Sequence, residues 1–311
     1  MSIASAAPRL ISDFRQRRPI RGKSLIITLF GDVVSQHGGT LWLGSLIDSL
    51  KLLGASEHLT RTSAFRLVQD GWLESDMIGR RSYYRFSDYG QREYSRAAER
   101  IYGAAETAWL GEWQLVLLLT VAEDTIGELR RSLAWLGFRP LTGLLYAKPG
   151  AVSGQLRRMI EEFGVRRDVL IMQGNADQAS SLDSMRDMVS QKWRLPEVRE
   201  RYTDFHDRYA FLARESKSRN RLFSRPEIAF TLRLMLIHDY RRLLLTDTAL
   251  PQELMGGEWP AIGVRQLTGQ LYRALTPASL EYIGSEMTGC EGRLPQQPGA
   301  AYFDRFGGIQ R

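Results

Sequence analysis

The chain has 311 residues and a formal net charge of +7, with 42 Lys and Arg against 35 Asp and Glu. This length exceeds what one hydrophobic core commonly serves, so we expect two or three domains. A single cysteine, Cys290, excludes a disulfide scaffold within the chain and a metal cluster built on several thiolates. No run of about eighteen consecutive apolar residues is present that could cross a membrane, and we expect a cytoplasmic protein.

The positive charge is concentrated near the N-terminus. Residues 1–87 hold twelve Lys and Arg against seven Asp and Glu, an excess of five positive charges. A local excess of this kind favours a polyanionic partner. We assign residues 1–22 to an N-terminal arm and residues 23–88 to a DNA-binding domain.

Residues 23–88 carry the pattern of helices followed by a hairpin. Apolar residues recur at three- and four-residue spacing over residues 23–34 and 46–53, which predicts two amphipathic helices. Ser56 can cap a third helix that runs to Asp70, because its hydroxyl can accept a hydrogen bond from an N–H of the first turn. The resulting order is helix, turn, helix.

The third predicted helix has an inner apolar face and an outer face that is polar and cationic. Outer positions near a helix N-terminus suit the major groove of DNA. The residues expected to contact DNA from this helix are Ser56, His58, Arg61, Thr62, Phe65 and Arg66.

The stretch DMIGRRSYYRFSD, residues 76–88, directly follows that helix and is typical of a hairpin. We expect Tyr84 and Phe86 to pack on the helices and two arginines to lie at the exposed turn. A hairpin in this position is the wing of a winged helix-turn-helix domain, and its guanidinium groups can pair with phosphate or enter a narrow minor groove. The alternative is a solvated hairpin whose arginines only protect an edge strand. The predicted DNA contacts of the wing are Arg80, Arg81, Ser82 and Tyr83.

The middle of the chain predicts a connecting helix and then an alternating domain. Residues 89–110 are charged and helix-prone. Over residues 111–192, three strand-like runs alternate with two amphipathic helices, which is a ferredoxin-like order. Glu123 and Asp124 follow the first strand and could hold a nuclease metal, but acids are ordinary at a helix N-terminus. We expect a platform for interaction or dimerisation here.

Residues 193–311 predict a mostly helical domain, so the fold class is α+β. Its most distinctive helix starts near Pro226 and is apolar nearly all round, so several of its charges should be buried and paired. Its arginines fit an ion-pair network or an anion site equally well. His238 and Asp239 could suggest a metal phosphohydrolase, but with only four histidines in the chain we expect no metal site.

Five distinctive segments occur in collinear order over nearly the whole chain: GTLWLGSLIDSLKLLG, RTSAFRLVQDGWL, IGRRSYYRFSDYG, LIHDYRRLLLTDTALPQEL and AYFDRFGG. Together they resemble the PaaX family, repressors of phenylacetic acid degradation operons. The resemblance implies an N-terminal winged helix-turn-helix, a central ferredoxin-like domain and a C-terminal effector domain. It also implies a homodimer that leaves its operator when phenylacetyl-CoA binds.

The resemblance also indicates where the effector would bind. The family motif IHDYRR falls on residues 237–242, and an aromatic-proline element falls on Trp259 and Pro260. A CoA thioester needs cations for its phosphates and an apolar, aromatic slot for its phenyl ring. The implied effector residues are His238, Tyr240, Arg241, Arg242 and Trp259. No cofactor is expected besides this effector.

Two other functions remain open. A metal-dependent nuclease or an acyl-CoA hydrolase would be an enzyme, but no G-x-S-x-G, H-E-x-x-H, Walker sequence or spaced Cys/His set occurs. A DNA-binding protein whose C-terminal half only dimerises would lack the ligand response. We predict a repressor that binds double-stranded operator DNA and is not an enzyme.

Overall fold

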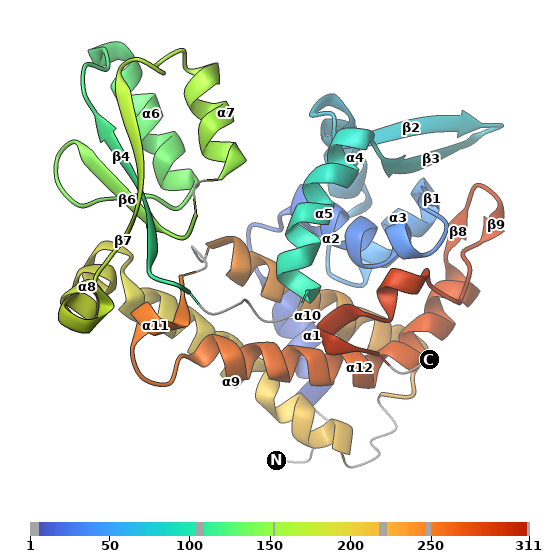
Figure 1. Cartoon of the computed structure of the whole chain (residues 1–311). Coiled ribbons are helices and arrows are strands. Elements are labelled where there is room, and N and C mark those ends of the chain that lie inside the picture. The colour runs from blue at the N-terminus through green and yellow to red at the C-terminus, as the bar shows by residue number, and fades with distance from the viewer. Residues whose placement is uncertain (1–5, 104–108, 152, 218–222, 247–249, 310–311) are drawn as a thin grey trace. The chain divides into compact units, whose positions relative to one another are not determined.

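A computed structural model of the chain describes residues 6–103, 109–151, 153–217, 223–246 and 250–309 (Figure 1). The chain divides into two compact units. The first comprises residues 1–105, 203–244 and 261–311, and the second comprises residues 106–202 and 245–260. The helical segment predicted over residues 193–311 thus contributes to both units.

The first unit begins with a helix that the sequence pattern did not predict. Helix α1 (Ala6–Gln16) lies in the stretch assigned to an arm, and its Leu10, Ile11 and Phe14 are buried. The following elements of the N-terminal part are α2 (Gly22–Asp32), the 3-10 helix η2 (Val34–Gln36), β1 (Thr40–Trp42), α3 (Leu43–Lys51), α4 (Glu57–Gln69), β2 (Leu73–Ile78), β3 (Arg81–Phe86) and α5 (Asp88–Tyr102).

Local signals define the ends of α4 as predicted. The Ser56 hydroxyl accepts a hydrogen bond from the Leu59 N–H at 3.2 Å, and Gly71 adopts a φ of +73° just after the helix. Strands β1, β3 and β2 form an antiparallel sheet in that order. Phe86 packs on the helices as predicted, with its ring 5.6 Å from that of Phe30 on α2.

Long helices and a compact tail complete the first unit. Helix α9 (Leu195–Lys217) contributes its residues from Thr203 onward to this unit, and helix α10 (Pro226–Thr246) and then α12 (Pro260–Glu286) follow in the chain. Beyond α12 lie the short strands β8 (Thr288–Gly289) and β9 (Gly292–Arg293) and the 3-10 helices η3 (Ala300–Tyr302) and η4 (Arg305–Gly307). Helix α10 is buried along most of its length, because apolar side chains surround it on nearly all sides.

The second unit is built on a four-stranded sheet. Its elements are β4 (Glu112–Leu118), α6 (Glu123–Trp135), β5 (Arg139–Pro140), β6 (Leu145–Pro149), α7 (Gly154–Glu162), β7 (Val169–Asn175), α8 (Gln178–Lys192) and α11 (Gln252–Met255). The strand order is β5-β6-β4-β7, and every neighbouring pair is antiparallel. The two-residue strand β5 was not predicted from the sequence.

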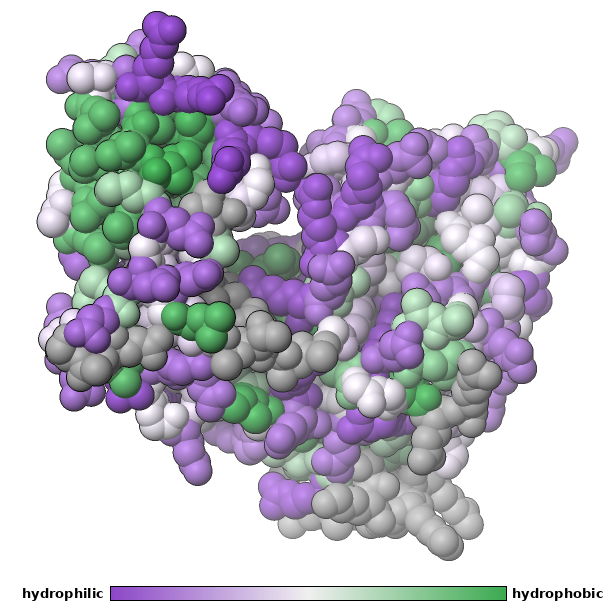
Figure 2. All heavy atoms as spheres, viewed as in Figure 1, coloured by the Kyte–Doolittle hydropathy of each residue, from purple (hydrophilic) through white to green (hydrophobic). Residues whose placement is uncertain are grey.

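The two faces of this sheet differ. Helices α6 and α7 pack on one face, where Val116 and Leu118 of β4 join Leu129, Leu133 and Ile160 in the core. The opposite face is apolar and partly open: Leu117 pairs in register with Leu145 and with Leu170, which is 46% exposed. Figure 2 shows apolar side chains gathered on the side of this unit where β4, β6 and β7 lie in Figure 1.

No helix in the described residues combines the length and the apolar character needed to cross a membrane.

Candidate nucleic-acid interface and buried charge clusters

Helix α4 presents the predicted polar face to solvent. Its inner residues Thr60, Ala64 and Leu67 are buried, whereas Phe65 is 60% exposed. The outer residues Ser56, His58, Arg61 and Arg66 are also exposed, and Thr62 is half-buried. Arg61 forms an ion pair with Glu57 at 2.8 Å, one turn earlier on the same helix. An exposed pair of this kind contributes little to stability, so Arg61 can exchange Glu57 for a phosphate.

The tip of the β2–β3 hairpin carries two cations. Arg80 and Arg81 are exposed, and within the described part of the chain neither forms an ion pair. Arg81 lies over the Trp42 ring, with Cζ 4.8 Å from the ring centroid. Arg85, by contrast, is neutralised by Glu74 and Asp76 of β2. The positive charge of the hairpin is therefore available at its tip.

The other two predicted wing residues are less accessible. Ser82 is half-buried, and Tyr83 is only 8% exposed. Tyr83 lies in the central strand β3, opposite Trp42 of β1 and Asp76 of β2. Tyr83 is therefore the least accessible of the predicted DNA contacts.

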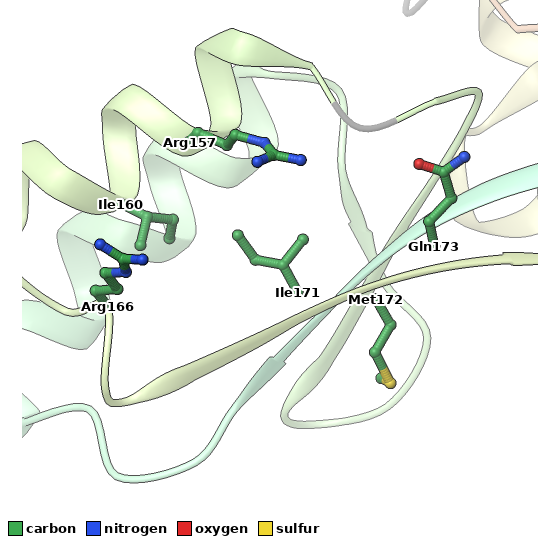
Figure 3. Close-up of a pocket in the computed structure, with 6 residues that line it drawn as sticks. All are labelled: Arg157, Ile160, Arg166, Ile171, Met172 and Gln173. Atoms are coloured by element: carbon green, nitrogen blue, oxygen red, sulfur yellow. The ribbon is translucent and has the colours of Figure 1, made fainter.

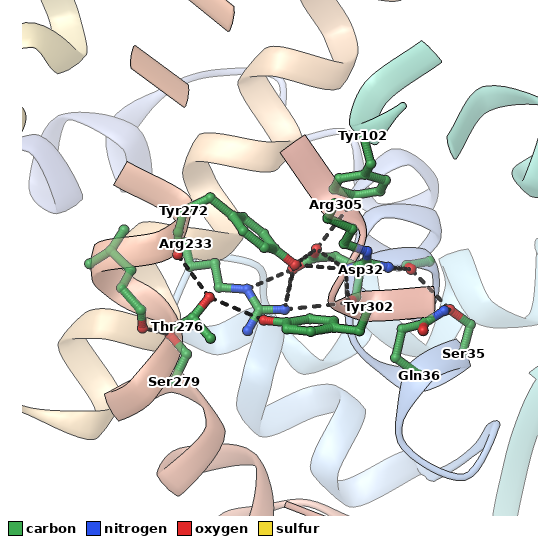
Figure 4. Close-up of polar contacts among 12 residues, drawn as sticks. Asp32, Ser35, Gln36, Tyr102, Arg233, Tyr272, Thr276, Ser279, Tyr302 and Arg305 are labelled. Carbon is green, nitrogen blue, oxygen red and sulfur yellow. Dashed lines mark hydrogen bonds and ion pairs between the residues drawn. The ribbon is translucent and has the colours of Figure 1, made fainter. Parts of the chain in front are cut away.

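A buried cluster of charges lies at the end of α2. The Asp32 carboxylate forms ion pairs with Arg233 of α10 at 3.0 Å and with Arg305 of η4 at 2.9 Å (Figure 4). The side chains of Asp32 and Arg233 are each 1% exposed. The hydroxyls of Tyr102 and Tyr272 each donate to Asp32 Oδ1 at 2.8 Å. The Asp32 carboxylate of α2 thus contacts residues of α5, α10, α12 and the C-terminal tail.

The cluster holds one more cation than anion. Burial by itself would raise the pKa of Asp32, but Arg233 and Arg305 hold that pKa below its ordinary value. Tyrosine rings cover both guanidinium groups: Arg233 Cζ lies 4.7 Å from the Tyr272 centroid and Arg305 Cζ 4.1 Å from the Tyr102 centroid. These cation–π contacts partly replace lost hydration of the arginines.

A second carboxylate, Asp239 of α10, also lies in a network. It accepts hydrogen bonds from Arg17 at 2.9 Å, from Arg208 of α9 at 3.1 Å and from the Tyr209 hydroxyl at 2.9 Å. The expectation that charges on this helix are buried and paired is therefore confirmed. This network links the chain just after α1 to α9 and α10.

Two further polar residues of α10 contact α2 directly. His238 Nδ1 lies 3.1 Å from the Thr28 hydroxyl, and Arg241 Nη1 lies 3.3 Å from the Ser24 hydroxyl. Burial lowers the pKa of His238 to about 4, so its imidazole is neutral at physiological pH. Burial also lowers the pKa of Arg241.

The five residues implied for the effector lie in both units. Four are on α10, where His238, Tyr240 and Arg241 are buried and Arg242 is exposed. The Tyr240 ring contacts Phe205, with centroids 5.9 Å apart. Trp259 belongs to the second unit; there Arg199 Cζ lies 5.0 Å from its ring centroid, and Tyr202 packs beside it.

The sequence pattern missed a pocket in the second unit. It has a volume of about 360 Å³ and is lined by Arg157, Ile160, Arg166, Ile171, Met172 and Gln173. Figure 3 shows the guanidinium group of Arg157 above Ile171 and that of Arg166 beside Ile160. These residues come from α7, from β7 and from the loop between them, so no short motif contains them. An anionic group with an apolar neighbour is the ligand that such a lining suits.

Among the described residues, no group of three or more His, Cys, Asp or Glu is placed to hold a metal ion. Glu123 and Asp124 lie in the first turn of α6, as expected for acids at a helix N-terminus.

Family models match three consecutive segments of the chain. They are described as PaaX-like protein over residues 21–90, PaaX protein central Cas2-like domain over residues 106–186, and PaaX-like protein C-terminal domain over residues 193–285. The transcriptional repressor PaaX of Escherichia coli (strain K12) is 38% identical over 291 residues, which cover 94% of this chain and 92% of that protein. The chain belongs to the PaaX family. This membership confirms that the protein is a transcriptional repressor and not an enzyme.

A solved structure shares the fold. The uncharacterized protein Rv0674 from Mycobacterium tuberculosis matches with a TM-score of 0.50 and 20% sequence identity, over 81% of this chain and 94% of that one. At this identity the likeness extends to the fold alone.

Proposed function

We propose that this repressor controls phenylacetate degradation genes. In this proposal a homodimer binds operator DNA through two winged helix-turn-helix domains and is released by an aryl-acyl-CoA, phenylacetyl-CoA above all. The observation that carries the DNA-binding part is the pairing of an exposed polar face on α4 with two cations, Arg80 and Arg81, at the hairpin tip. Operator DNA and acyl-CoA meet in the cytoplasm, where we expect the protein to act.

The order and pairing of the elements support the winged helix-turn-helix. Helices α2, α3 and α4 precede the hairpin of β2 and β3, and β1 joins the same sheet as an outer strand. In domains of this kind the helix before the hairpin enters the major groove and the wing contacts the flanking backbone. Here α4 holds that position.

The pairing of the central sheet supports a ferredoxin-like domain. If β4, β5, β6 and β7 are numbered 1 to 4 in chain order, their order across the sheet, read from β7, is 4-1-3-2. Two helices on one face of such an antiparallel sheet are typical of this arrangement.

The open face of that sheet is the surface we propose for the homodimer. Leu115 and Met172 share one register row, and Leu117, Leu145 and Leu170 share the next. Stable homodimer interfaces are more apolar than the rest of a protein surface. A dimer would place two copies of α4 in successive major grooves, about 34 Å apart.

The contacts of α10 support an effector site at His238, Tyr240, Arg241 and Arg242 in the first unit, and Trp259 of the second unit stays a separate prediction. Both His238 and Arg241 contact α2, which packs against α4. A ligand that moved α10 would therefore act on the helix beneath the DNA-binding face.

The test measures binding to a labelled fragment of the upstream DNA over a range of salt concentrations. Arg80→Ala with Arg81→Ala should weaken binding and reduce the slope of log K against log salt by about two, since each phosphate contact contributes close to one. Arg85→Ala is the matched control, because Arg85 lies on the same hairpin but is already paired with Glu74 and Asp76. If both variants lowered the slope equally, the tip arginines would have no special role.

The effector part is tested in the same assay. Arg241→Ala should leave the affinity for DNA intact and reduce release by phenylacetyl-CoA. If phenylacetyl-CoA did not release the wild-type protein, the chain would be a DNA-binding protein without this ligand response.

A further inference from the structure

The C-terminal tail places an aromatic side chain in a strained position. Phe306 of η4 has φ 54° and ψ 30°, a left-handed conformation that residues other than glycine rarely adopt. Gly307 and Gly308 follow it, with φ of 81° and 119°. Tertiary contacts must hold such a conformation in place. The two glycines that follow can change their backbone angles easily, so the chain can move away from this conformation when those contacts are lost.

Those contacts are mostly aromatic. The Phe306 ring centroid lies 5.3 Å from that of Tyr272, 5.5 Å from that of Tyr102 and 6.2 Å from that of Tyr240. Gly269 of α12 makes room for it, because a Cβ at Gly269 would come within 3.1 Å of the Phe306 Cβ. We call these four residues of the surrounding helices, Tyr102, Tyr240, Gly269 and Tyr272, the aromatic seat.

Cations lie at the rim of the aromatic seat. Arg265 Cζ is 5.8 Å from the Phe306 centroid, and Arg273 Nη1 donates to the Phe306 carbonyl at 3.2 Å. Phe306 itself is only half-buried, so the aromatic seat opens to solvent on one side. Three tyrosine rings with guanidinium groups at the rim suit an aromatic ring that is followed by a hydrogen-bond acceptor.

The residue before Phe306 connects the tail to the DNA-binding helices. Arg305 Nη1 donates to both the carbonyl and the carboxylate of Asp32 at 2.9 Å, and Nη2 donates to the Gly31 carbonyl at 3.3 Å. These are the last two residues of α2. If Phe306 left the aromatic seat, Arg305 would lose its fixed position and the end of α2 would lose these donors.

We propose that the aromatic seat is a ligand site that Phe306 occupies in this structure, and that the aromatic ring of the acyl-CoA effector takes its place. The tail is then an internal competitor: the ligand displaces Phe306, Arg305 withdraws from Asp32, and α2 and α4 shift together. This inference rests on the proposed function for its link to DNA release, but the exchange of rings can be tested alone. It assigns the ring of the effector to Tyr102, Tyr240 and Tyr272, and it places Arg265 and Arg273 beside the thioester carbonyl that follows the ring, which accepts hydrogen bonds.

The first experiment uses toluene as a probe of the aromatic seat. Phe306→Ala removes the internal ring, and toluene should raise the melting temperature of this variant but not that of Phe303→Ala. Phe303 is the matched control, because it is a half-buried phenylalanine of the same tail whose ring packs on Tyr302 outside the aromatic seat. If toluene affected the two variants alike, the aromatic seat would be ordinary core packing and the proposal would be wrong. Should Phe306→Ala not fold, Phe306→Leu keeps apolar volume without the ring and takes its place.

The second experiment measures binding of phenylacetyl-CoA and of acetyl-CoA, which lacks the ring. Removal of an internal competitor raises the apparent affinity by the reciprocal of the fraction of protein that had been open to the ligand. Phe306→Ala should therefore bind phenylacetyl-CoA about tenfold more tightly than Phe303→Ala, a difference of about 1.4 kcal/mol, with acetyl-CoA equal in both. Equal affinities for phenylacetyl-CoA would refute the exchange. If toluene raised the melting temperature of Phe306→Ala but no variant bound either thioester, the aromatic seat would be supported as a ligand site and the effector in the proposed function would be wrong.

A third readout follows the tail in the wild-type protein. The Gly308 N–H donates to the Arg305 carbonyl at 3.1 Å and the Ile309 N–H donates to the Phe303 carbonyl at 2.8 Å. Bound phenylacetyl-CoA should increase hydrogen exchange at both amides. Unchanged or slower exchange with the ligand bound would show that the tail stays in place.

Discussion

Replacing Asp32 by asparagine should destabilise the first unit strongly, because it leaves two buried guanidinium groups without a carboxylate. Arg233 and Arg305 have side chains only 1% and 5% exposed, and Asp32 is the anion that forms an ion pair with both. Removal of one partner from a buried ion pair costs about 3–5 kcal/mol, since the remaining charge is neither hydrated nor neutralised. The asparagine carbonyl still accepts one hydrogen bond, so we expect about 3 kcal/mol, at the lower end of this range.

The assay is urea denaturation followed by hydrogen exchange in peptides of α2 and α10, which separates unfolding of the first unit from that of the second. Asp48→Asn is the matched control: Asp48 is an exposed aspartate of α3, and its replacement should change the free energy of unfolding by less than about 0.5 kcal/mol. A loss below about 1 kcal/mol for Asp32→Asn would refute the reasoning, because it would mean that the arginines are stable there without the carboxylate.

The same comparison has a predicted pH dependence. The pKa of folded Asp32 lies below its ordinary value of 3.8, so the unfolded state binds more protons in acid. The stabilisation is therefore complete above that ordinary value and is lost as the pH falls through the lower, folded value. The difference between the wild-type protein and Asp32→Asn should shrink over this acidic window, and a difference independent of pH there would contradict the assignment.

Further predictions concern stability in mild acid, the homodimer and the second unit. Burial lowers the pKa of both His37 and His238 from 6.5 to about 4, so the free energy of unfolding should fall as the pH drops from 6.5 to 4, and His238→Gln should flatten part of this slope in urea titrations at each pH. Leu117→Glu should convert the proposed homodimer to a monomer in sedimentation experiments, and a variant that stays dimeric would move the interface elsewhere. Arg166→Ala should leave the affinity for DNA and its salt dependence unchanged, because we expect the pocket beside Ile171 to lie outside the DNA contact. A smaller slope of log K against log salt would show that Arg166 contacts DNA.

The sequence predicts those parts of the first unit that depend on neighbouring residues. The cap at Ser56, the left-handed Gly71 and the three- and four-residue spacing of apolar side chains define α4, and all of them act within a few residues. Helix α1 was missed because its stretch was assigned to an arm, although Leu10, Ile11 and Phe14 have helical spacing. Strand β5 has only two residues, which is too short for a periodic signal.

The buried clusters could not be predicted residue by residue. Arg233 is 201 positions from Asp32 and Arg305 is 273 positions away, so no spacing relates them. The pattern on α10 did predict that its charges are buried and paired, because an apolar helix leaves them nowhere else to lie. It did not identify the partners, and it gave no sign that Phe306 packs among Tyr102, Tyr240 and Tyr272.

The most direct test of the account is a titration of phenylacetyl-CoA into the purified protein bound to its labelled upstream DNA at fixed salt, with free CoA and phenylacetate as controls. We predict that the thioester releases the DNA at concentrations where neither control does. DNA binding that responded to none of the three would contradict the proposed effector.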